Sequence, residues 1–246
     1  MTTDRWTRAV RQQVGLGRIL PLGGARDGAW IAERAAEAAL RRAVARDAPG
    51  VRLDGLRIGL ADPEGADEPA VPAPPSALPP GPLRLTAEFA ATAAQPLPVT
   101  ASRLRTALAE AAAERIGLAV TEVDLRVTEL LDARPPGAPA APRQDAAPEA
   151  VPEPGTLPEP GDTEEGRAAA AALAVPGVIR LTGAPGRPVR LTAGPPAASL
   201  PHRHARVDLA VRADHRALDV ARAVRSAVAA SLPDRPTVAV LVTAFD

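Results

Sequence analysis

Residues 48–51 read APGV and residues 175–178 read VPGV, and each tetrapeptide lies between a predicted helix and a predicted strand. Pro cannot continue a helix, and Gly tolerates the left-handed backbone on which many helices end. Val then favours extended chain, so the tetrapeptide predicts the end of a helix followed at once by a strand. Because this junction recurs, the sequence indicates that one small α/β unit occurs twice.

The first unit is predicted from apolar periodicity. Asp27 is a plausible N-cap for its first helix, Glu37 and Arg41 form a favourable pair four residues apart, and Gly117 is well placed to end its second helix. We expect helices at residues 29–46 and 100–116, and strands at residues 17–22, 51–60, 83–89 and 122–127.

Residues 83–89 alternate between apolar and polar side chains, which predicts a strand with one buried and one solvated face. Acidic residues on the solvated face lie near Arg84 and Arg126, so we expect cross-strand charge pairs there. Trp30 is expected to fill the core, with a role as an exposed partner anchor as the alternative.

The second unit repeats this order with fewer large apolar residues. Asp162 and Glu165 predict a capping box that begins an Ala-rich helix, and a strand pair is expected around Pro185 and Gly186. The other expected elements are strands at 206–212 and 238–242 and a helix at 218–232. We expect this reduced unit to depend for its stability on packing against the first unit or against another chain.

Two Pro-rich segments, residues 62–82 and 132–165, hold more than half of the 29 prolines. Both lack apolar periodicity, so we expect extended or disordered chain with polyproline II character. The predicted fold class is α+β, with two tandem two-layer α/β sandwich modules joined by a Pro-rich linker. The expected division is a first module at 1–131 with the insertion at 62–82, a linker at 132–161, and a second, reduced module at 162–246.

The composition excludes several kinds of chemistry. Cys is absent, which excludes disulfides, thiolate metal sites and a Cys nucleophile. The 29 basic residues are all Arg and balance 29 acidic residues, a pattern that we attribute to a high-GC bacterial genome. No secretory signal and no run of about 18 apolar residues is present, so we expect a cytoplasmic protein without a transmembrane segment.

Candidate catalytic and ligand-binding groups are few. His202, His204 and His215 could approach one metal ion, but their spacing lacks a ligand motif, and whether they bind anything stays open. No Ser lies in a nucleophile elbow, and Ser102 is expected to cap a helix. No phosphate-binding loop is present. The sequence therefore predicts no catalytic, cofactor-binding or metal-binding residue, no cofactor and no enzymatic activity.

Two other functions stay open. A basic patch in the second unit could bind RNA or another nucleic acid, although the balanced net charge gives no strong nucleic-acid signal. Its six arginines are Arg203, Arg206, Arg212, Arg216, Arg222 and Arg225. An enzyme with an unrecognised site is the weaker alternative.

Three segments carry a resemblance to a known family: the helix that leads into residues 48–51, the strand at 83–89, and the stretch 99–127, which ends in GLAVTEVDLRV. Together they resemble the alkaline shock protein family. The resemblance extends loosely to residues 163–244. It implies small α/β modules, a non-enzymatic scaffold or interaction role in the stress response of the cell envelope, and a protein partner or self-association. It also implies peripheral association with the membrane through a partner protein.

Overall fold

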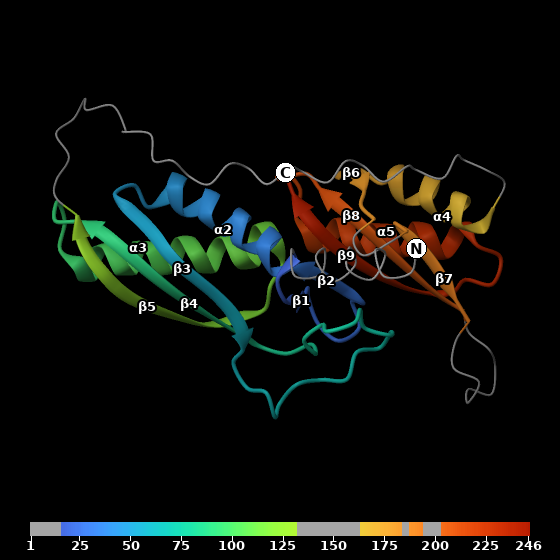
Figure 1. Ribbon diagram of the computed structural model, residues 1–246, viewed down its shortest axis with the longest axis horizontal. Coiled ribbons are helices and arrows are strands. Elements are labelled where there is room, and N and C mark those ends of the chain that lie inside the picture. The colour runs from blue at the N-terminus through green and yellow to red at the C-terminus, as the bar shows by residue number, and fades with distance from the viewer. Residues whose placement is uncertain (1–15, 132–162, 184–186, 194–202) are drawn as a thin grey trace, which may run out of the picture.

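The computed structural model describes residues 16–131, 163–183, 187–193 and 203–246. Its elements form two mixed sheets with helices packed against them, an α+β architecture that confirms the predicted class. Figure 1 shows the two sheets side by side along the long axis of the molecule. The predictions for Asp162, His202, Pro185, Gly186 and residues 132–161 lie outside the described residues.

The first sheet has three strands in the order β3-β4-β5, antiparallel between β3 and β4 and parallel between β4 and β5. Helices α2 and α3 pack against it (Figure 1). Its elements are α2 (Glu33–Asp47), β3 (Val51–Leu60), β4 (Leu83–Thr92), α3 (Leu97–Glu110), the π-helical turn η1 (Ala111–Ile116) and β5 (Val120–Leu131).

The second sheet has six strands in the order β1-β2-β9-β8-β6, with β7 also paired to β8. Helices α4 and α5 pack on each other and beside this sheet. Its elements are β1 (Ile19–Pro21), β2 (Ala29–Ala32), α4 (Glu164–Leu173), β6 (Val178–Leu181), β7 (Val189–Thr192), β8 (His204–Val211), α5 (Ala217–Ser231) and β9 (Thr237–Phe245).

The repeated tetrapeptide does in both places what its residues predict. Gly50 lies between α2 and β3 with φ of 87°, and Gly177 lies between α4 and β6 with φ of 91°. Backbone in this region strains any residue with a Cβ, which is why Gly occupies both positions. Gly117 ends η1 in the same way, with φ of 96°, as predicted.

The start of the chain departs from the prediction. Residues 29–32 were expected to begin a helix, but they form β2, which pairs in parallel with β9 through Trp30 and Leu241. The helix begins at Glu33 after Ala32, so the N-cap prediction for Asp27 was wrong. Burial explains the difference, because all four residues of β2 are buried and the strand completes the second sheet. Residues from the first half of the chain therefore belong to the sheet built mainly by the second half.

The insertion at residues 62–82, called the strap below, is not disordered. The N–H of Ala70 donates to the carbonyl of Ala25 at 2.9 Å, and the N–H of Leu78 donates to that of Ile19 at 2.8 Å. Val71 is buried on the face of the second sheet that is opposite the main core, against Trp30 and Leu241. The strap thus has no regular strand or helix, but Val71 and Ala77 pack on one face of the second sheet. Figure 1 shows the strap running beside β1 and β2.

The main core is continuous across both halves of the chain. It lies on the helix side of the sheets and contains buried residues such as Leu40, Phe89, Leu108, Val224 and Val240. Trp30 is also buried, as predicted, but on the strap side, and its indole Nε1 has no hydrogen-bond partner among the described residues.

The two short strands of the second unit differ from the hairpin expected around Pro185 and Gly186. β6 and β7 do not pair with each other, since both pair antiparallel with β8 at successive positions along its edge. Together they take the place that β3 takes beside β4. The helix before them, α4, is capped by Thr163, whose Oγ1 accepts a hydrogen bond from the N–H of Gly166 at 3.1 Å.

Candidate functional site: a groove between α2 and α3

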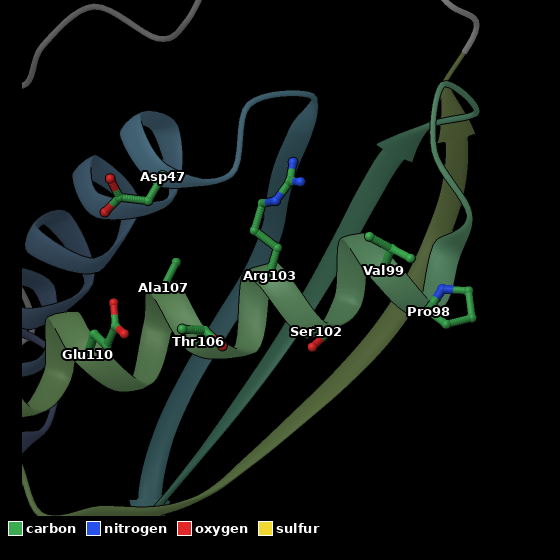
Figure 2. Close-up of a pocket in the computed structure, with 8 residues that line it drawn as sticks. All are labelled: Asp47, Pro98, Val99, Ser102, Arg103, Thr106, Ala107 and Glu110. Carbon is green, nitrogen blue, oxygen red and sulfur yellow. The ribbon is translucent and has the colours of Figure 1, made fainter.

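An open groove of about 610 Å³ lies on the helix side of the first sheet. Figure 2 shows α3 running along it and the end of α2 facing it. Ala107 lies at its floor, buried, and Val99 is 48% exposed at one end. The remaining lining residues are Asp47, Pro98, Ser102, Arg103, Thr106 and Glu110.

The groove gathers few groups that could perform chemistry. Ser102 lies within α3, whose N-cap is Pro96, so the predicted capping role of Ser102 was wrong. The two described histidines belong to the second sheet region, so neither stands beside Ser102 as a general base. Hydrogen bonding from Arg46 lowers the pKa of Asp47, which therefore stays ionised rather than poised for proton transfer. The groove offers a contact surface of mixed apolar and polar side chains rather than a catalytic constellation.

The predicted histidine group is not brought together. His204 begins β8 and its Nδ1 lies 2.9 Å from Thr237 Oγ1, while His215 follows β8 and its Nδ1 lies 2.8 Å from Asp214 Oδ1. The length of β8 separates the two rings. Within the described ranges, no cluster of three or more His, Cys, Asp or Glu side chains could hold a metal ion.

The six arginines proposed as a basic patch are each engaged. Arg203 binds both Glu164 and Asp234, and Arg225 donates to backbone carbonyls, including that of Val238 at 3.0 Å. Arg206, Arg212, Arg216 and Arg222 are each paired with an Asp side chain. Because these contacts neutralise the charges or use the donors inside the protein, the six residues do not form a free cationic surface.

The carboxylates with shifted pKa values connect elements of the fold. Burial raises the pKa of Asp27, but hydrogen bonds from Arg222 and from the N–H of Gly24 outweigh it and the net pKa is lowered. The bond to Arg222, at 2.8 Å, joins the β1–β2 loop to α5. Glu33 has a lowered pKa for a similar balance, in which Arg18 opposes the effect of burial. These shifts arise from structural ion pairs rather than from a pocket.

Asp208 is the one charged residue that is almost fully buried among those described, at 2% exposure. Burial raises its pKa to about 6, although Arg206 binds it through two hydrogen bonds of 2.9 and 3.1 Å. The pair lies on β8, and both of its members belong to the same strand. It has the perturbed pKa of a functional residue, but the carboxylate is closed off by its own neighbour.

The exposed face of the first sheet carries the predicted charge pairs. Arg84 on β4 lies 2.6 Å from Glu122 on β5, and Arg126 on β5 lies 3.5 Å from Glu88 on β4. The i,i+4 pair of Glu37 and Arg41 is also present, at 2.7 Å. The groove itself was not predicted, because it depends on how the ends of α2 and α3 meet, and no sequence motif marks that contact.

No helix in the described part of the chain combines the length and the apolar character that crossing a bilayer requires. Comparison of the chain with protein-family models, with curated proteins and with solved structures finds no match.

Proposed function

We propose that the chain is a non-enzymatic, cytoplasmic interaction or structural protein built from two tandem modules that resemble alkaline shock proteins. The observation that carries the proposal is the repeated topology. In each half a helix is followed by antiparallel strand pairing, a second helix and a final strand parallel to the central one, around β4 in one half and β8 in the other. A duplicated packing unit suits a protein that acts through its surfaces.

The distribution of charged groups supports the same proposal. Arg203 ties α4 to the loop before β9 through Glu164 and Asp234, and Asp27 ties the β1–β2 loop to α5. These groups hold elements in place, while the groove between α2 and α3 is open and lined by both apolar and polar side chains. An active site instead gathers a nucleophile, a base and polar donors around one point.

The boundaries and the setting belong to the proposal as well. The proposed modules are residues 1–131 and 162–246, joined by the Pro-rich linker at 132–161, and the first of them contributes β1 and β2 to the sheet of the second. The resemblance adds a role in the stress response of the cell envelope, with peripheral membrane association through a partner protein.

The test is co-purification of the full chain from its native host. Two differently tagged copies would be expressed together and the recovered proteins quantified by mass spectrometry. The bait would be compared with Val99→Glu, which adds charge to an exposed position in the groove, and with the matched control Ser226→Glu on an exposed position of α5. We expect recovery of the second copy or of a specific protein. A strictly monomeric protein by light scattering that recovers neither would contradict the proposal.

A further inference from the structure

The outer edge of β5 is the structural counterpart of an edge that the second half of the chain covers. β5 and β9 are the last strands of their halves, and each runs parallel to a central strand, β4 or β8. The far side of β9 pairs with β2, whereas β5 ends its sheet among the described residues. An open strand edge presents unpaired N–H and C=O groups that can accept another strand.

The direction of the backbone groups at this edge follows from one contact. The carbonyl of Val123 accepts a hydrogen bond from Nε of Arg105 on α3 at 3.4 Å, which places this carbonyl on the side away from β4. Backbone groups alternate along a strand, so Leu125 and Val127 also direct their N–H and C=O groups outward. Val127 is 41% exposed, which is high for a side chain on the helix side of the sheet.

The sequence of β5 matches itself when read in the opposite direction about Leu125. In an antiparallel pair centred there, Leu125 faces its own copy, Val123 faces Val127 and Asp124 faces Arg126. Apolar side chains thus meet on the helix side and opposite charges meet on the exposed side. Leu125 and the Val123–Val127 pair use the outward backbone groups, while Asp124 and Arg126 occupy the closer, non-hydrogen-bonded positions. The Val123 carbonyl has a second lone pair for this bond beside the one that accepts from Arg105.

We propose that two copies of this chain associate through β5, antiparallel about a two-fold axis at Leu125, and join their three-stranded sheets into one continuous sheet. A two-fold contact uses the same patch on both partners, which the self-matching sequence satisfies. The inference rests on the proposed interaction role and deepens it by naming the partner, a second copy, and the surface.

The test exchanges the charges of the central pair in the full chain. Arg126→Asp would set Asp124 against an Asp of the second copy twice, and Asp124→Arg would set two Arg residues against each other twice. Both side chains are exposed, at 75% for Arg126 and 62% for Asp124, so the substitutions leave the core untouched. By analytical ultracentrifugation we expect a dimer for the unchanged chain and about tenfold or greater weakening for each variant.

The two variants also complement each other. In an equimolar mixture, the two acidic side chains of the Arg126→Asp chain face the two basic side chains of the Asp124→Arg chain, so a heterodimer should form. A double variant that carries both substitutions restores opposite charges at each position and should dimerise again. Circular dichroism and thermal unfolding would confirm that each variant is folded. Weakened dimers whose association does not return on mixing would overturn the pairing, and so would a dimer that neither substitution weakens.

A monomeric unchanged chain at all concentrations would also overturn the inference. That result would leave the proposed function standing if co-purification recovers a different protein. Failure of both experiments would contradict both proposals, so the two can be told apart.

Discussion

Gly117 offers a direct test of how closely the two halves of the chain depend on each other. Its φ is 96°, and a Cβ added there would lie 2.4 Å from Cβ of Leu218 on α5. Cβ of Leu218 is fixed to the backbone and cannot move aside by a change of rotamer. We therefore expect Gly117→Ala to combine two costs, the strain of a left-handed backbone and the overlap with the other half.

The magnitudes separate the two contributions. Left-handed backbone at a non-Gly residue costs about 1–2 kcal/mol, and overpacking of a filled site costs about 1–3 kcal/mol more. Gly50 provides a matched control, because its φ is 87° and an added Cβ would meet only the side chain of Thr92, whose hydroxyl oxygen lies nearest at 3.0 Å. The free energy of unfolding should therefore fall by about 1–2 kcal/mol in Gly50→Ala, which suffers mainly the backbone strain. In Gly117→Ala it should fall by roughly 2–5 kcal/mol, because the overlap with Leu218 adds to the strain.

Urea unfolding followed by circular dichroism would measure both variants under the same conditions. We expect the midpoint of Gly117→Ala to fall clearly below that of Gly50→Ala, with the same dependence on denaturant concentration. Equal destabilisation of the two variants would refute this expectation, because the contact with Leu218 would then contribute nothing. A second, earlier transition in Gly117→Ala alone would show that the halves had come apart.

The other predictions concern the buried acid, the strap and one helix cap. The pKa of Asp208 is raised to about 6 in the folded protein, so its contribution to stability is present below pH 4 and is lost as the pH rises to 6, by up to ~3 kcal/mol. Asp208→Asn should remove this fall in stability with rising pH, measured as the unfolding midpoint between pH 4 and 7. An unchanged pH dependence would contradict the assignment of this effect to Asp208. In a Trp6→Phe background, Val71→Asp should shift the fluorescence of Trp30 to the red by admitting water under the strap, whereas an unshifted spectrum would show that the strap does not shield it. Thr163→Ala removes the cap of α4 and should cost about 1 kcal/mol in urea unfolding, while Thr163→Ser should cost little.

Local signals predicted most of the secondary structure. The glycines at 50 and 177 end their helices because left-handed backbone is a local requirement, and the alternation at 83–89 is visible because one face of β4 is exposed. β2 was missed because it is buried on both faces and so shows no alternation. Ile31 lies at a helical spacing from later residues only because it precedes a real helix.

The packing of the strap and the presence of the groove could not be predicted from local sequence patterns, because both depend on contacts between distant residues. The proline content of residues 62–82 correctly disfavours helix and strand, but packing needs only a few anchors, here chiefly Val71 and the bonds to Ala25 and Ile19. The sequence left open whether the histidines bind anything, and the separation of His204 and His215 by the length of β8 could be seen only in the fold. Pairing partners far apart in the sequence decide such features, and a single sequence carries no record of them.

The pairing of β2 with β9 has a consequence for how the chain is made. Trp30 on β2 is synthesised well before Leu241 on β9, because all strands of the first sheet lie between them in the sequence. Contacts of such long sequence separation form slowly, because a large loop must close before they can stabilise it. The three strands of the first sheet can pair before β9 is made, but β2 must wait for β9. Its apolar side chains are therefore open to aggregation or chaperone capture until β9 has been synthesised.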